Sequence, residues 1–293
     1  MKIKFITFLL LGVLAACQDL DTLSGITTDK KNVITTGSDL VSTLQSGYIF
    51  WWKGNHSEFP AVALGVAGDA YGLGRNFFGA TQLGMEPRTA FQNSVGAATE
   101  LRQLVEVPWY NNLTAVTTAN DVLSAMDNNI SIDQNGAQDQ SVRAAAHLLR
   151  GLSWGYLGLI YNESALVNEK EDLNNPIPLV PYSDMTQAAV TELEQAIELA
   201  TAVGDDFVHS YFNGLRLDKS QFVELCHAYA ARFFITNAKE LYQKIKLCSG
   251  RLFSSTRVKV YLMILRLSQM EVTGKATIST YLQKRVKGLF GQG

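Results

Sequence analysis

The sequence predicts an all-α protein in which stacked helix pairs are joined by long loops. Three observations lead to this fold class. From about residue 38 onward, apolar residues recur every three or four positions in several segments, which is the period of an amphipathic helix. Hydrophobic residues make up 47% of the 293, enough to bury a sizeable core. Three prolines between residues 176 and 181 enforce an extended connection between two of the helical segments.

The first half of the predicted domain contains three helices. The first spans about residues 38–54, where Ser38 can cap the start and Gly54 can end the helix. Its apolar face consists of Val41, Leu44, Tyr48 and one of the adjacent tryptophans, Trp51 or Trp52. The second helix covers about 98–106 and stops before Pro108, because the residue before a proline disfavours helical geometry. The third covers about 110–127.

Three further helices follow in the second half. The longest spans about residues 138–161. Asp184 with Gln187 reads as an N-cap that opens the next helix, whose outward face would carry Glu192, Glu194 and Glu198. The last clear helix covers about 218–236 and places Cys226 in the core.

Residues 154–161 carry a repeat-like pattern. Trp154, Leu157, Gly158 and Tyr161 match the W-x2-L-G-x2-Y signature of a tetratricopeptide helix. In such a pair the aromatic rings fill the groove between two helices, and the glycine lets the partner backbone come close. The rest of the repeat does not follow, since Lys170 stands where an alanine is expected. We therefore expect an irregular tetratricopeptide-like architecture.

Composition and charge exclude some functions. The formal net charge of −2 gives no global attraction to nucleic acid, so we expect no nucleic-acid partner. Three cysteines cannot build a disulfide framework, and four histidines with no HExxH or CxxC motif leave no recognisable metal site. We expect neither a metal nor a cofactor.

The N-terminus has the pattern of an export signal. Residues 1–16 combine a charged start with a short apolar stretch, which predicts a signal peptide. They end in small residues directly before Cys17, which resembles a bacterial lipobox. The mature chain would begin at a lipidated Cys17, followed by an N-terminal segment to residue 37, and attached acyl chains would hold it on a membrane. The alternative is a soluble secreted protein in which this cysteine is incidental.

The charge changes sharply near residue 239. Residues 239–293 contain eleven Lys/Arg and two Glu, a net charge of +9, whereas residues 1–238 contain 14 Lys/Arg and 25 Asp/Glu, a net charge of −11. This divergent basic tail could bind anionic lipid, form a divergent terminal domain, or be translated from a shifted reading frame and be poorly ordered. We favour the third interpretation, because apolar and basic residues mix there without a period.

Four stretches between residues 17 and 238 resemble the SusD/RagB family of surface lipoproteins from Bacteroidetes. They are Cys17-Gln-Asp19, the segment Pro108-Trp-Tyr-Asn-Asn-Leu113 that leads to Ala119-Asn-Asp-Val-Leu123, the segment Arg143-Ala-Ala-Ala-His-Leu-Leu-Arg-Gly-Leu152 that leads to Gly155-Tyr-Leu157, and Pro176-Ile-Pro-Leu-Val180. The helical domain of this resemblance is residues 38–238. Family members continue beyond that point with a second, loop-rich half.

The resemblance implies a lipid-anchored protein at the cell surface of the outer membrane. Such a protein binds a glycan or similar nutrient and delivers it to a SusC-like TonB-dependent transporter, and it is not catalytic. Asp19 and Asp21 look like the acidic surface-export signal of these lipoproteins. In the family, that second half, which we expect to be missing or divergent here, supplies part of the ligand site and of the transporter contacts.

A glycan site needs aromatic rings for the apolar faces of the sugar and polar groups for its hydroxyls. The glycine-rich loop 68–79 combines both, and Trp51 offers a further ring at the end of the first helix. The candidate glycan-binding residues are Trp51, Asp69, Tyr71, Arg75, Asn76 and Phe78. The alternative is that the aromatic residues only pin the loop to the helices.

Two other functions remain open from the sequence. A helical interaction scaffold without a glycan ligand would share every feature except the aromatic loop. An exported helical glycoside hydrolase would need two carboxylates that flank the bond, for which Asp69 with Glu86, or Asp205 with Asp206, are the candidates. Glu169, Glu171 and Asp172 lie in a polar loop, where we expect them to be solvated or at most to form a loose calcium site.

Overall fold

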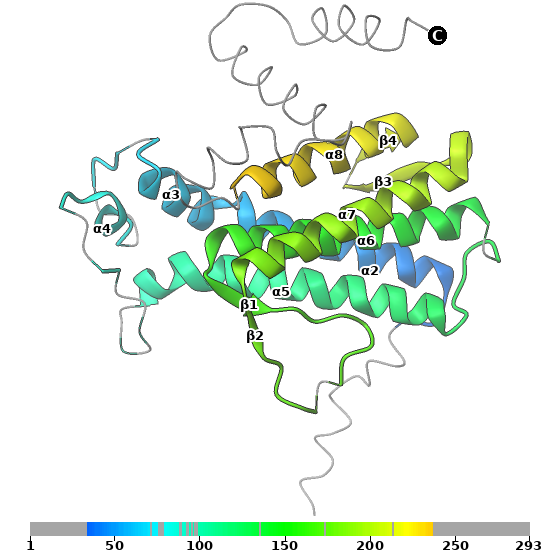
Figure 1. Ribbon diagram of the computed structural model, residues 1–293, viewed down its shortest axis with the longest axis horizontal. Coiled ribbons are helices and arrows are strands. Elements are labelled where there is room, and N and C mark those ends of the chain that lie inside the picture. Colours follow the sequence, from blue (N-terminus) through cyan, green and yellow to red (C-terminus); the bar gives the residue numbers. More distant parts are fainter. Residues whose placement is uncertain are drawn as a thin grey trace, which may run out of the picture.

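The structure, a computed structural model, describes residues 34–236 with the exception of 71, 76–78, 88–89, 92–93, 95, 97–98, 135, 173 and 213 (Figure 1). The predicted signal peptide, Cys17 and the basic tail therefore lie outside the described residues. The all-α prediction is confirmed. The helices are α2 (Gly37–Asn55), α3 (Glu58–Ala67), α4 (Thr81–Gly84), α5 (Thr99–Asp127), α6 (Ala137–Ile160), α7 (Tyr182–Val203) and α8 (Lys219–Thr236), with a short 3-10 turn, η4, at Gly204–Asp206.

The long helices pack in the spatial order α2, α5, α6, α7 and α8, so most neighbours in the chain are also neighbours in space (Figure 1). Helix α6 is the centre of this arrangement and contacts the four others. Its buried side chains, Leu148, Leu149, Leu152 and Leu157 among them, join one continuous core with residues from every long helix. Helix α3 packs on α5, and α4 packs on α3, around a smaller cluster.

The close helix approach expected at Gly158 is present between α6 and α7. A Cβ atom placed on Gly158 would lie 2.8 Å from Thr186 Cγ2 and 3.1 Å from the carbonyl oxygen of Tyr182. Any larger residue would push α7 away. The physical role predicted for this glycine is thus confirmed, whereas the likeness to a tetratricopeptide repeat stays a prediction.

Two predicted helix starts differ from the structure. Thr36, not Ser38, caps α2, because the Thr36 hydroxyl accepts from Asp39 N (3.3 Å) and the Asp39 carboxylate accepts from Thr36 N (2.8 Å). This reciprocal pair is a capping box. Helix α7 begins at Tyr182 after Pro181, so Asp184 lies inside the first turn and favours the helix by its charge.

Pro108 does not separate two helices, since α5 runs through it without a break. One contact within α5 and two with distant segments hold this part of the helix in place. Asn112 donates to the Pro108 carbonyl (2.8 Å) and to Asn55 Oδ1 (3.0 Å) on α2, while Tyr161 O–H donates to the Val105 carbonyl (2.5 Å). These contacts outweigh the local preference of the proline.

Two short hairpins interrupt the helices and were not predicted. Strand β1 (Glu163–Ala165) pairs antiparallel with β2 (Leu179–Pro181), and β3 (Val208–Phe212) pairs antiparallel with β4 (Leu215–Asp218). The second hairpin lies against α2, α6 and α8 and buries His209 and Tyr211. Because a histidine occupies one of its inward positions, the alternation of apolar residues is too weak to predict the strand.

Candidate functional site

The structure describes three of the predicted glycan-binding residues, Trp51, Asp69 and Arg75. Tyr71, Asn76, Phe78 and the lipidation candidate Cys17 lie outside the described residues. Trp51 is separated from the other two by α3, and Arg75 is exposed in the segment that follows Asp69.

Asp69 lines a hollow of about 390 Å³ beside the glycine-rich loop, which we call the loop hollow. Its walls are Val66, Asp69, Gly72, Leu73, Thr81, Gly84 and Met85. Helix α3 ends just before Asp69, whose φ of 53° is left-handed, and Ala70 N donates to the Gly65 carbonyl (2.9 Å) to close the turn. A carboxylate, a hydroxyl and glycine backbone therefore share this surface with apolar side chains.

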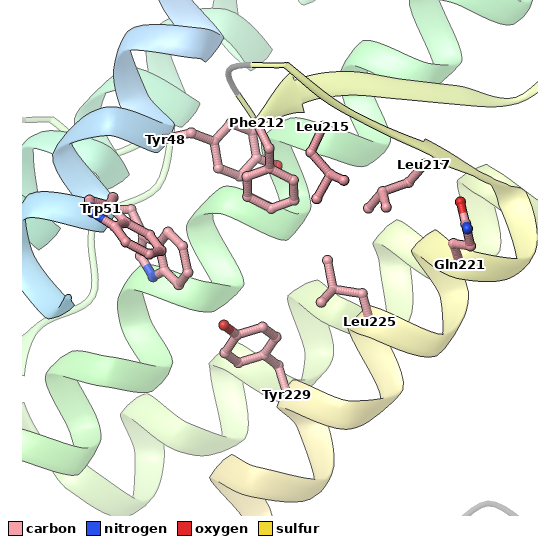
Figure 2. A pocket seen from close by; sticks show the side chains of 9 residues that line it. Tyr48, Trp51, Phe212, Leu215, Leu217, Gln221, Leu225 and Tyr229 are labelled. Carbon is pink, nitrogen blue, oxygen red and sulfur yellow. The ribbon is translucent and has the colours of Figure 1, made fainter. Parts of the chain in front are cut away.

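A second hollow, of about 530 Å³, lies between α2, the β3–β4 hairpin and α8 (Figure 2). We call it the aromatic groove, and its lining residues are Tyr48, Trp51, Trp52, Phe212, Leu215, Leu217, Gln221, Leu225 and Tyr229. Sequence reasoning missed the hairpin side of this groove. Apolar residues alternate at Leu215 and Leu217, and this pattern could have indicated a strand. It covers only one short strand and is too brief to predict the hairpin.

The two adjacent tryptophans face different surroundings. Trp51 is 4% exposed, and its ring makes edge-to-face contacts with Tyr156 (5.9 Å between centroids) and Tyr229 (6.0 Å). Trp52 is 57% exposed and lies against His56 (4.7 Å). The ring of Trp51 is buried, and the glycan-binding role of this residue stays a prediction. Trp51 continues the inward face of α2, and Trp52 is the accessible ring of the pair.

The aromatic groove offers a ligand few polar groups. The Tyr48 O–H donates to the Ala145 carbonyl (2.7 Å), and Gln221 Oε1 accepts from Asp218 N (3.1 Å) in the cap of α8. None of its lining side chains carries a charge at neutral pH, where tyrosine is protonated, and burial raises the pKa of Tyr48 and of Tyr229 still further. Such walls suit an apolar group better than a sugar, whose hydroxyls require several partners.

Behind the groove, His209 is fully buried and held neutral. Its Nε2 lies 3.2 Å from the Tyr48 oxygen, and Tyr48 already uses its proton on Ala145. His209 Nε2 therefore carries the hydrogen and donates it, which leaves Nδ1 without a partner. Burial lowers the pKa of His209 to about 3. The residue acts in packing, among the rings of Tyr48, Phe212 and Phe222.

A buried charge cluster ties the polar loop after β1 to α6 and α7. The Arg150 guanidinium donates to both carboxylate oxygens of Glu192 (2.8 and 3.0 Å) and also binds Glu169. Asn120 accepts from Arg150 (3.0 Å) and donates to the Val167 carbonyl (2.9 Å). The predictions that Glu192 faces outward and that Glu169 is solvated are therefore wrong. Both carboxylates bind a cation that is only 4% exposed.

Opposing effects set the ionisation of this cluster. Burial alone would raise the pKa of Glu192, but hydrogen bonds from His147 and Arg150 and the charge of Arg150 outweigh it and hold that pKa below its usual range. The pKa of Glu169 is lowered in the same way, against its own burial, by a backbone hydrogen bond and by Arg150. Glu192 and Glu169 are both anionic at neutral pH, so their ion pairs with Arg150 hold the loop after β1 against α6 and α7.

The structure brings no pair of candidate catalytic carboxylates together across a described cleft. Asp205 is fully exposed and binds Lys219 Nζ (2.8 Å). Glu86 is exposed and is not among the residues that line the loop hollow beside Asp69. Among the residues that the structure describes, no group of three or more His, Cys, Asp or Glu side chains is placed to hold a metal ion.

No family model matches the chain, and no curated protein and no solved structure is similar to it at a significant level. Within the described part of the chain, none of the helices has the length and apolar character needed to cross a bilayer.

Proposed function

We propose that the chain is a SusD-like surface lipoprotein, anchored in the outer membrane through Cys17, that binds an oligosaccharide or similar nutrient. It would deliver this nutrient to a SusC-like TonB-dependent transporter. The lipobox-like sequence before Cys17 and the four SusD/RagB-like stretches support the proposal, and the stacked helices provide a compatible scaffold.

The observation that carries the binding function is the loop hollow. Asp69, chosen from the sequence as a partner for sugar hydroxyls, lines a hollow that also presents Thr81 and apolar side chains. Its volume of about 390 Å³ lies in the range of small-ligand pockets, which is roughly 300–1,000 Å³. A sugar ring needs both an apolar wall and hydrogen-bonding groups, and the loop hollow offers a better mixture of the two than the aromatic groove does.

Affinity electrophoresis tests this site. The chain from Gln18 to Gly293 would be run through native gels that contain soluble starch, xylan, inulin or pectin. We expect at least one polysaccharide to retard the chain, and Asp69→Asn to reduce the retardation. Asp206→Asn is the matched control, because Asp206 is an exposed carboxylate outside the loop hollow. Equal retardation of both variants would contradict the role of Asp69.

The proposed role includes no catalytic step. Incubation with the retarding polysaccharide is expected to release no reducing sugar, and such release would favour the glycoside hydrolase instead. An interaction scaffold would show neither retardation nor release and would bind only a protein partner.

A further inference from the structure

The aromatic groove is open in the described part of the chain, and its rim exposes large apolar side chains. Trp52 of α2 is 57% exposed and Leu215 of β4 is 54% exposed. Figure 2 shows Leu215, Leu225 and Tyr229 on opposite sides of one hollow. Apolar groups that gather at one hollow mark a surface that another segment or molecule covers.

We propose that the apolar run from Val260 to Leu265 of the same chain packs into the aromatic groove. Helix α8 forms one wall of the groove through Leu225 and Tyr229 and ends at Thr236, about two helical turns beyond Tyr229. The chain therefore leaves the described residues beside the groove. The 23 residues between Thr236 and Val260 can span up to about 76 Å when extended, so reach does not limit the contact.

The chemistry of the run matches that of the groove. Residues 260–265 are six consecutive apolar side chains, while Lys259 and Arg266 mark its two ends and would stay in solvent. The groove has uncharged walls and few polar groups, as such a run requires. The two parts also carry opposite net charge. Residues 34–236 contain ten Lys/Arg and 22 Asp/Glu, a net charge of −12, against +9 for residues 239–293, which favours their association at long range.

This proposal assigns the tail to the fold and so opposes the interpretation of a shifted reading frame that never evolved to pack. We assign the tail to the fold because the structure contains an open groove that the sequence alone did not reveal. It also goes beyond the proposed nutrient binding, because it concerns a different hollow and needs no sugar.

Site-specific photocrosslinking tests the contact in the chain from Gln18 to Gly293. A photoreactive benzoylphenylalanine would replace Trp52 at the rim or, as the control, Tyr110 on α5, which is 62% exposed and does not line the groove. We expect position 52 to crosslink within one chain to peptides that contain residues 260–265, and position 110 not to do so. Equal yields at both positions, crosslinks between two chains only, or no crosslink at position 52 would overturn the proposal.

Tail variants provide the second test. Ile264→Asp is expected to lower the yield from position 52 about tenfold, because burying one branched apolar side chain shifts a docking equilibrium by at least that factor. Gln269→Asp adds the same charge to the tail outside the apolar run and should leave the yield unchanged. An unchanged yield in Ile264→Asp would also overturn the proposal. Circular dichroism of each variant checks that the helical domain is intact. If a tail variant fails to fold, the crosslink from position 52 to the unsubstituted tail still decides whether the run lies in the groove.

Discussion

Replacing Arg150 by methionine is expected to lower the free energy of unfolding by about 3–5 kcal/mol. The magnitude follows from burial, because the Arg150 and Glu192 side chains are only 4% and 10% exposed. Removing the cation leaves Glu192 as a buried anion without its bidentate partner, and breaking such a pair on one side costs this much. The change also releases Glu169, so the polar loop after β1 loses its attachment to α6.

Urea unfolding followed by circular dichroism measures this loss, with a double variant to separate its causes. Arg150→Met combined with Glu192→Met should recover much of the stability, because a full apolar replacement of a buried pair is often neutral. Arg102→Met is the matched control, since its ion pair with Glu106 is about one-third exposed on each side and is worth only about 0.3–0.5 kcal/mol. A loss in Arg150→Met no larger than in Arg102→Met would refute the reasoning.

Two further predictions concern the buried core. Lowering the pH from 8 to 5 should destabilise the fold by about 2 kcal/mol, because His209 takes up a proton near pH 6.5 only in the unfolded chain. The contribution of the neutral, buried His209 to the free energy of unfolding is complete above pH 6.5 and is lost as the pH falls towards 3. His209→Phe should remove most of that pH dependence in urea titrations at both pH values, and an unchanged slope would contradict the assignment. Gly158→Val should cost about 1–3 kcal/mol in the same assay, because its side chain would collide with α7, and a neutral effect would show that the helices can separate freely.

The helices were predictable where a strong apolar period coincides with clear ends. Helices α6 and α8 match the predicted spans 138–161 and 218–236 within a residue. At Pro108 the local rule failed, because contacts from Asn55 and Tyr161, distant in the sequence, hold α5 in one piece. Contacts between residues far apart in the sequence leave no pattern in the residues around Pro108 from which a continuous helix could be predicted.

The candidate sites were predictable only in part. Asp69 was found because glycines and polar residues mark an exposed loop, and the structure places it at a hollow. The Arg150 cluster was missed because its members lie on four segments, and Glu192 by itself reads as an outward-facing residue of α7. The aromatic groove was missed because the β3–β4 hairpin that forms one side is short and carries a buried histidine.

The most direct test of the central claim is a calorimetric titration of the chain from Gln18 to Gly293 with an oligosaccharide cut from the polysaccharide that retards it in gels. The account predicts saturable binding of one oligosaccharide per chain, with the affinity weakened by Asp69→Asn and retained by Asp206→Asn. Absence of saturable binding to oligosaccharides from every polysaccharide in the set, by a chain whose helices unfold cooperatively, would contradict a nutrient-binding role.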